Sequence, residues 1–168
     1  MKIISLLLLN FIINPISFAQ DPTSYKINKQ ENKYVFSENS IKIFDGQRIF
    51  ISTKNQTGRL EGLKLVDTAE SKIKDYSKLM TYVLRQNGEK NICIDVNIVI
   101  DDNKKSQTVL IVNNPYKGTM SYKAKIFSKK ENDYIETSIA NVEPGISGIE
   151  LWPYPITDFI LYDFIIKE

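Results

Sequence analysis

From Asn91 onwards the chain alternates apolar and polar side chains with a period of two. In "ICIDVNIVI" (92–100) the isoleucine and valine residues at even positions share one face, and the other face carries Cys93, Asp95, Asn97 and Val99. A period of two is that of a β-strand. We therefore expect the even-numbered face to meet a core and the opposite face to be mostly wet.

Further short segments of the same kind follow, separated by turn signals roughly every ten residues. They are "QTVLIVNN" (107–114), "TMSYKAKIFSK" (119–129), "YIETSIANV" (134–142), "GIELW" (148–152) and "FILYDFIIK" (159–167). In the last, strict alternation puts Ile160, Tyr162 and Phe164 on one face. The other face then carries Phe159, Leu161, Asp163 and Ile165. The pattern predicts an all-β fold, an antiparallel two-sheet immunoglobulin-like β-sandwich.

The N-terminal half also contains strand patterns. "KYVFS" (33–37) and "LKLVD" (63–67) predict short strands. In "SIKIFDGQRIFISTK" (40–54) the isoleucines alternate on both sides of Asp45-Gly46. Because an Asp-Gly pair supplies the positive φ of a tight turn, we expect a β-hairpin here.

Residues 67–88, "DTAESKIKDYSKLMTYVLRQNG", fit two structures. Asp67 or Thr68 can cap a helix, and Gly88 can end it. "LMTYVLRQ" is also rich in β-forming residues, and Asn87-Gly88 is a hairpin signal. We favour a short helix near 68–77 followed by a strand from Leu79, and leave helix or strand open for residues 77–86.

The N-terminus has the features of an export signal. Lys2 is followed by the apolar run Ile3 to Ile13, and Ser17 and Ala19 are small residues at a cleavage position. We expect a cleaved signal peptide at 1–19, a flexible leader at 20–32 and a single β-sandwich domain at 33–168. Export into a bacterial periplasm or out of the cell follows, with no membrane span in the mature chain.

Several kinds of chemistry lack their usual residues. The chain has no histidine and one cysteine, which excludes histidine-based catalysis and a thiolate metal site. Its formal charge of +2 falls to +1 without Lys2, so it carries no electrostatic signature of nucleic-acid binding. No glycine-rich phosphate loop is present. We expect no enzyme activity, no cofactor and no metal, and a buried, inert thiol at Cys93.

The composition does not exclude a site built from carboxylates alone. Asp101-Asp102 with Asn103 is a weak calcium pattern beside the simpler reading of a solvated hairpin tip. Two pairs of acids could in principle serve a hydrolase. They are Asp158 with Asp163, and Glu143 with Glu150.

The segment "EPGISGIELWPYPITDF" (143–159) contains the chain's single tryptophan. Pro153 and Pro155 hold Trp152 and Tyr154 extended. We expect a rigid connection between the two sheets in which Trp152 closes the core, Tyr154 is the more exposed ring, and Gly148 is a bulge or a close approach. In the alternative, Tyr116, Trp152 and Tyr154 form a surface that stacks on a ligand.

The segment "VLIVNNPYKGTMSYKAKIF" (109–127) resembles, at the level of the fold, the strand–turn–strand of immunoglobulin-like modules. That resemblance implies no functional residue. The expected function is an exported, non-catalytic domain that binds a protein or a cell-envelope partner, with strands such as 134–142 able to extend a partner's sheet. The alternatives are a carbohydrate- or small-ligand-binding module that uses surface aromatics, and a carboxylate-only hydrolase. Oligomeric state is left open.

Overall fold

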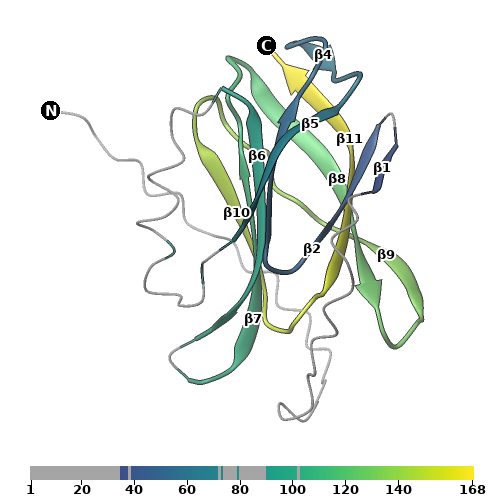
Figure 1. Cartoon of the computed structure of the whole chain (residues 1–168), viewed down its shortest axis with the longest axis vertical. Helices are drawn as coiled ribbons and strands as arrows, with labels where there is room; N and C mark the ends of the chain where they lie inside the picture. Colours follow the sequence, from purple (N-terminus) through teal and green to yellow (C-terminus); the bar gives the residue numbers. More distant parts are fainter. Residues whose placement is uncertain (1–34, 38, 72, 74–78, 80–89, 102) are drawn as a thin grey trace, which may run out of the picture.

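The computed structural model describes residues 35–37, 39–71, 73, 79, 90–101 and 103–168. The expected signal peptide, the leader and the Asn87-Gly88 turn therefore lie outside the described residues. Within them the chain is built from antiparallel strands (Figure 1). In chain order these are β1 (Val35–Ser37), β2 (Ser40–Phe44), β3 (Gln47–Ser52), β4 (Gly58–Arg59), β5 (Lys64–Glu70), β6 (Ile92–Ile100), β7 (Ser106–Asn113), β8 (Thr119–Ser128), β9 (Asp133–Thr137), β10 (Ser147–Trp152) and β11 (Asp158–Lys167).

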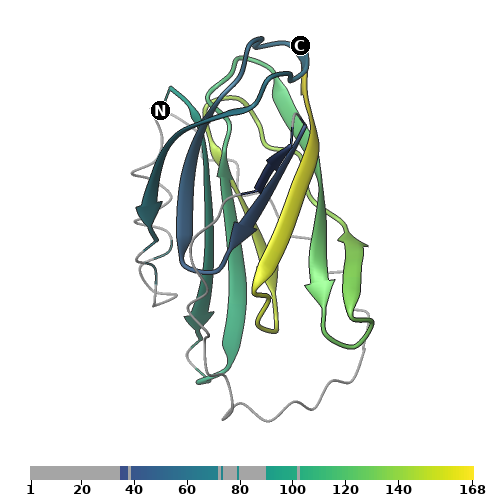
Figure 2. The same ribbon diagram turned by 45° about the vertical axis from the view of Figure 1, so that its right-hand side comes forward.

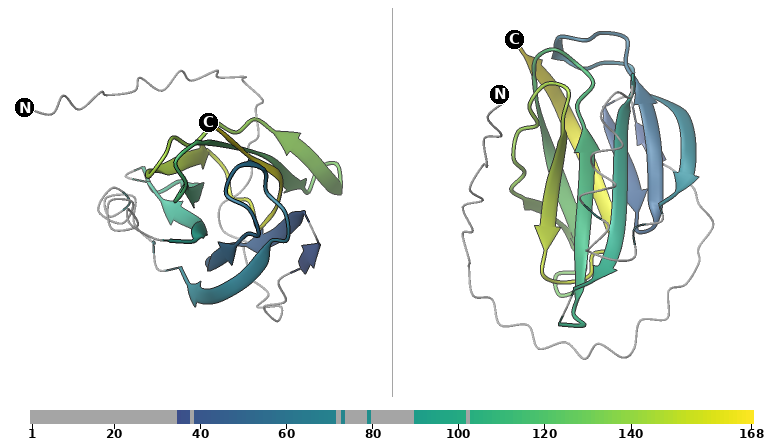
Figure 3. Two further views of the ribbon diagram at one scale, coloured as in Figure 1. Left: turned by 90° about the horizontal axis from the view of Figure 1, so that it is seen from above. Right: turned by 90° about the vertical axis from the view of Figure 1, so that its left-hand side faces the viewer.

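The strands form two sheets that pack face to face (Figure 3). Sheet A has the order β1-β2-β11-β8-β9, with β4 paired to β11, and sheet B has the order β10-β7-β6-β3-β5. The prediction of a two-sheet, all-β sandwich is therefore confirmed. Among the described residues, no helix is long and apolar enough to cross a membrane.

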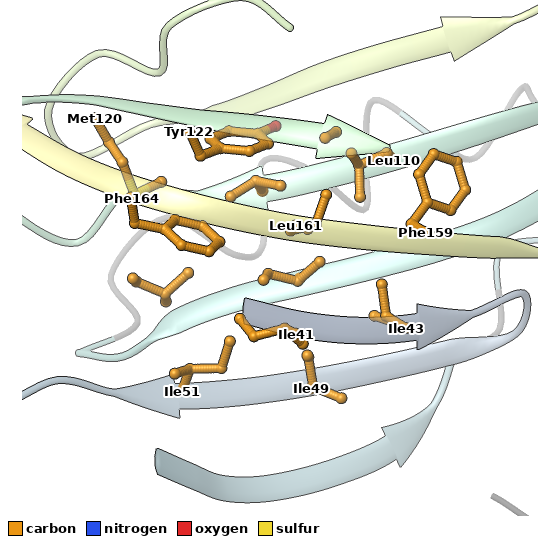
Figure 4. Close-up of a cluster of buried hydrophobic side chains, with 14 of the residues drawn as sticks. Ile41, Ile43, Ile49, Ile51, Leu110, Met120, Tyr122, Phe159, Leu161 and Phe164 are labelled. Atoms are coloured by element: carbon orange, nitrogen blue, oxygen red, sulfur yellow. The ribbon is translucent and has the colours of Figure 1, made fainter. Parts of the chain in front are cut away.

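The core lies between the sheets and is filled by one face of each strand. In Figure 4 isoleucines from β2 and β3 point toward the aromatic and leucine side chains of β7, β8 and β11. The fully buried large side chains include Ile41, Ile43, Ile49, Ile51, Leu110, Met120, Phe159 and Leu161. Burial of such side chains is the main stabilising term in a fold of this size.

The turn at Asp45-Gly46 is a corner between the sheets, so the expected hairpin is wrong. β2 belongs to sheet A and β3 to sheet B, and the two strands do not pair. The backbone of the turn instead bonds outward: the Asp45 N–H donates to the Thr157 carbonyl at 3.0 Å, and the Gly46 N–H to that of Val96 at 2.9 Å. Gly46 does have the expected positive φ, 78°. A corner fits because the isoleucines of both strands must face the same core.

The expected helix near 68–77 is also wrong where the chain is described. Thr68, Ala69 and Glu70 continue β5 and pair with β3, and Ser71 and Ile73 are not helical. The open edge of β3 supplies ladder bonds that outweigh the local capping signal. Asp67 accepts the Thr68 N–H at 2.8 Å within this strand. Leu79 is helical, so the expected strand does not begin there, and the rest of 77–86 lies outside the described residues.

Strand β11 contains a bulge that breaks its alternation. Its register against β8 moves from Tyr162↔Lys123 to Ile165↔Ser121, so β11 has one extra residue, and Asp163 has a φ of 57°. Phe164 is consequently buried on the same side as Phe159. The expected division of this strand into two faces is therefore wrong beyond Tyr162. Beyond the bulge, β11 also exchanges its neighbour β2 for β4.

Strand 134–142 is shorter than expected, because β9 ends at Thr137 and the chain then crosses to sheet B. Val142 forms only an isolated bridge with Met120. The Pro144-Gly145 turn is confirmed, with a φ of 70° at Gly145. Gly148 is a close approach as expected, since a Cβ there would lie 2.7 Å from Cγ2 of Val142. The register of β10 against β7 is continuous, so there is no bulge.

Candidate functional site

The outer faces of the two sheets differ sharply. On sheet B, the face expected to be wet is buried: Cys93, Asp95 and Asn97 are each at most 2% exposed. Ile73 and Leu79 pack over this face against an apolar cluster. That cluster contains Val99, Val109 and Ile111, with Ile149 and Leu151 beside it. Alternation within a strand predicts one buried face, but it does not predict that another segment covers the opposite face.

The buried face of sheet B holds charge as well as apolar groups. Arg48 on β3 is opposite Asp95 on β6, and its Nε lies 3.0 Å from Oδ1 and 3.1 Å from Oδ2 of that carboxylate. The Cys93 thiol donates weakly to Asp95 Oδ2 at 3.8 Å. The thiol of Cys93 is buried, as expected.

The outer face of sheet A is open and carries a row of side chains across four strands. Lys42, Ile160, Lys125 and Glu136 are direct neighbours on β2, β11, β8 and β9. None of these four side chains is buried. Strands of one sheet therefore present a mixed basic, acidic and apolar surface to solvent.

Aromatic rings flank that row. Lys42 Nζ lies 5.1 Å from the ring centroids of both Phe44 and Tyr134, and 3.3 Å from Asp158 Oδ1. Burial opposes the charge on Lys42, but its bonds to Tyr134 and Asp158 raise its pKa overall. Lysine over an aromatic face is a favourable cation–π contact.

A second group of charges gathers around Tyr162. Its hydroxyl donates to Glu136 Oε1 at 2.7 Å, and Lys125 Nζ lies 5.6 Å from its ring centroid. Beside it, Asp163 accepts from Lys123 at 3.0 Å and from Arg59 at 2.8 Å. The bond from Lys123, with that from Arg59, lowers the pKa of Asp163. Two cations therefore hold this carboxylate in place on the bulge.

Strand β9 is the outer edge of sheet A, beside β8. In Figure 2 it is the light green strand at the right-hand margin, and no described strand pairs with its far side. Its register with β8 is continuous over all five residues, and Ile135 is 41% exposed. The Tyr134 N–H donates to the Asp133 carboxylate at 2.7 Å, so this N–H points away from β8. By alternation the Glu136 N–H points the same way.

The other described edges are better protected. β5 has an extra residue, Val66, between the pairs Phe50↔Asp67 and Ile51↔Leu65, and bulges hinder the addition of a strand. β1 has three residues within the described part of the chain. Beside β10 runs the crossing segment, whose Ala140 N–H donates to Glu150 at 2.6 Å. β9 is thus the longest regular edge that the described residues leave open.

The expected site residues Tyr116, Trp152 and Tyr154 do not form one surface. Trp152 pairs with Thr108 at the start of β7, whereas Tyr116 follows the end of that strand, at the opposite end of the sheet. Tyr116 is 9% exposed and shares a 2.7 Å hydrogen bond with Thr53. Tyr154 is 42% exposed, as expected for the outer ring.

Trp152 closes the core at the connection between the sheets. It is 8% exposed, its ring centroid lies 5.1 Å from that of Phe159, and its Nε1–H donates to Thr137 at 3.2 Å. The connection runs from β10 in sheet B to β11 in sheet A, as expected. Thr108 fixes it, because its hydroxyl donates to the Tyr154 carbonyl and accepts the Ile156 N–H.

The carboxylate patterns have separate local partners. Asp158 binds Lys42, Asp163 binds Arg59 and Lys123, and Glu143 accepts from Thr119. Asp101 accepts the N–H groups of Asn103 and Lys105 in the β6–β7 turn, and Asp102 lies outside the described residues. Across the described ranges, no three His, Cys, Asp or Glu side chains cluster closely enough to hold a metal.

No protein-family model, curated protein or solved structure matches the chain. Sequence reasoning missed Arg59, Lys125 and Tyr162. The lysines on the polar face of "YKAK" were the only signal for Lys125, and an aspartate within the apolar strand "LYDF" was the only signal for Tyr162. Neither segment contains Arg59.

Proposed function

We propose that this chain is an exported, non-catalytic binding protein whose partner is another protein of the cell envelope. The proposal includes the cleaved signal at 1–19 and an immunoglobulin-like β-sandwich. The connection from β7 to β8 between the sheets supports that likeness. The observation that carries the function is the open edge of β9.

The binding mode is addition of an extended partner segment to β9. The outward N–H of Glu136 and the neighbouring carbonyl groups provide backbone hydrogen bonds, and backbone pairing of this kind gives affinity with little dependence on sequence. Specificity comes from the side chains. Ile135 on one face favours an apolar partner residue, and Tyr134 on the other is already close to Lys42.

The Asp133 carboxylate limits the exposure of this edge. It occupies the outward Tyr134 N–H, as Asp67 occupies that of Thr68 on the β5 edge. Side-chain capping of an edge donor lowers the tendency of identical sheets to pair with each other. A partner strand would displace Asp133 from Tyr134, and a basic residue in that strand would then meet the released carboxylate.

The test removes one outward donor without disturbing the β8–β9 ladder. Glu136→Pro deletes the outward N–H, whereas Glu136→Gln keeps it together with an acceptor for Tyr162. Each protein is used as bait for a cell-envelope fraction. We expect one partner to be retained by the wild type and by Glu136→Gln and lost with Glu136→Pro. A Thr68→Pro bait, which alters the β5 edge in the same way, should retain it.

Hydrogen exchange on the purified complex provides the second arm. The amides of Tyr134 and Glu136 should gain protection when the partner binds, because both become part of a continuous sheet. Failure of the wild type to retain any partner, or retention that is indifferent to Glu136→Pro, contradicts the proposal. Protection confined to β5 or β10 would place the partner on a different edge and also contradict it.

A further inference from the structure

Two adjoining hollows lie near the bulge, one on the open side of sheet A and the other at the segment between β3 and β5. The first has a volume of about 310 Å³, and its lining includes Ile160, Tyr162, Lys125 and Asp163. The second has a volume of about 360 Å³, and its lining includes Lys54, Glu61 and Gly62. Asn39 and Arg59 line both hollows. The two hollows therefore adjoin at a common wall, and we call the pair the furrow.

The bulge in β11 shapes the first hollow. Asp163 has a φ of 57°, a conformation that a residue other than glycine rarely adopts. The extra residue directs the Asp163 carboxylate between Arg59 and Lys123, at 2.8 and 3.0 Å. Bulges frequently serve to re-aim a side chain at a functional surface. Here the bulge fixes Arg59 at the wall that the two hollows share.

The loop that carries the second hollow is held by the side chain of Asn55. Its Nδ2 donates to the carbonyls of Thr57 and Arg59 at 2.8 and 2.7 Å, and its Oδ1 accepts the Glu61 N–H at 2.8 Å. The Lys54 N–H donates to the Glu61 carbonyl at 3.0 Å. A loop bound in this way keeps its cation and its carboxylate in place before a ligand arrives, which lowers the entropy lost on binding.

The furrow has a surplus of positive charge. Its lining contains three cations (Lys54, Arg59 and Lys125) and two carboxylates (Glu61 and Asp163). Asp163 is already shared with Lys123. Lys125 has no carboxylate within ion-pair distance among the residues the structure describes, and contacts the Tyr162 ring instead. An anionic group that reached Lys125 would gain a charge-assisted bond without breaking an existing ion pair.

We propose that the furrow binds an acidic oligosaccharide, with a carboxylate-bearing sugar unit in each hollow. The apolar side of one ring packs on Ile160 beside the Tyr162 ring, over which Lys123 and Lys125 already lie. Its carboxylate binds Lys125, and that of the next unit binds Lys54, on opposite sides of Arg59. Asn39, Glu61 and Asp163 provide hydrogen-bonding groups for the hydroxyls. This site does not depend on strand addition at β9, so either proposal can fail alone.

The experiment is calorimetric titration with a tetramer of galacturonic acid, and with its methyl ester as the uncharged matched probe. We expect the acid to bind and the ester to bind at least about tenfold more weakly. Lys125→Gln and Arg59→Gln should each weaken binding of the acid about tenfold. Lys42→Gln removes a charge from the same face outside the furrow, and should leave the affinity within about twofold.

Three outcomes overturn the proposal. The first is no heat of binding for the acid at millimolar concentration. The second is equal binding of acid and ester, which would mean that the cations play no part. The third is an equal loss in Lys42→Gln and Lys125→Gln, which would show attraction to the whole face and no defined site.

Discussion

The guanidinium Nε of Arg48 lies within 3.1 Å of both carboxylate oxygens of Asp95, a residue with no exposed surface. The two residues are direct neighbours on β3 and β6. A buried charge that loses its partner is strongly destabilising, because the remaining ion stays out of water. The pair therefore ties the centre of sheet B together in a way that its apolar neighbours do not.

Removal of the Arg48 guanidinium should show how far stability depends on this ion pair. We expect Arg48→Met to lower the free energy of unfolding by about 3–5 kcal/mol. The matched control is Arg59→Met, which also removes an arginine from a carboxylate, but from a side chain that is 62% exposed. Exposed pairs contribute at most about 1 kcal/mol. Urea unfolding of both variants measures the difference, and equal losses would contradict the buried role of Arg48.

The contribution of Asp45 to the free energy of unfolding should fall as pH rises. Burial raises the pKa of its carboxyl, although the backbone N–H groups of Ile98 and Gly46 oppose the shift. An acid with a raised folded-state pKa binds more protons when folded, so its contribution is present below its ordinary pKa. That contribution is lost as pH rises through the higher, folded-state value.

Two substitutions separate charge from hydrogen bonding at this position. Asp45→Asn keeps an acceptor for the Ile98 N–H, 2.6 Å away, and should match or exceed the stability of the wild type at pH 7. Asp45→Ala leaves that N–H without its acceptor and should cost about 1–3 kcal/mol. Thermal unfolding between pH 3 and pH 7 checks both results. A loss in Asp45→Asn as large as in Asp45→Ala would show that the charge itself is stabilising.

Gly148 and Val142 should be energetically coupled. Gly148→Ala places its new methyl 2.7 Å from Val142 and should cost about 1–3 kcal/mol through overpacking. Val142→Ala makes room for that methyl, so the double variant should be more stable than the sum of the single losses predicts. A double-mutant cycle by urea unfolding gives the coupling, which we expect to be at least about 0.5 kcal/mol. If the two single losses were strictly additive, the backbone at Gly148 would move away from Val142 without cost, which would contradict the coupling.

The fluorescence of Trp152 should show directly that its side chain is buried. Because it is the only tryptophan in the chain, the emission of the native protein should be blue-shifted and resistant to acrylamide. Trp152→Ala should cost about 3–5 kcal/mol. Thr137→Val, which removes only the acceptor of the indole N–H, should cost about 0.5–1.5 kcal/mol. Emission at the wavelength of free tryptophan would contradict the closed connection.

Period-two alternation was sufficient to predict most strands and the two-sheet class, because one face of each strand must meet the core. It could not predict partners. The Asp45-Gly46 signal is the same for a hairpin and for a corner. The choice depends on the carbonyls that Val96 in β6 and Thr157, just before β11, supply to the turn. The bulge in β11 could not be predicted either, because Asp163 fits the alternating pattern and only its positive φ distinguishes it.

The candidate sites depend on what covers each sheet. Asp95 and Asn97 look like solvated residues, because the strand pattern contains no sign that this face of sheet B is buried or that Ile73 and Leu79 pack on it beside Val99. Tyr154 was correctly expected to be exposed, since prolines on both sides keep it off a regular sheet. The furrow joins residues from 39, 54–62, 125 and 160–163, and only the folded topology brings such separate segments together.

The outer face of sheet B is covered around Cys93, whereas the outer face of sheet A is open to solvent. The single cysteine tests this directly, because Cys93 is 1% exposed on the closed face. In native protein we expect a thiol reagent such as DTNB to modify Cys93 no faster than the protein unfolds. Lys125→Cys in a Cys93→Ala background should react within the mixing time. Rapid modification of Cys93 in the native state would contradict the account, since both faces would then be open.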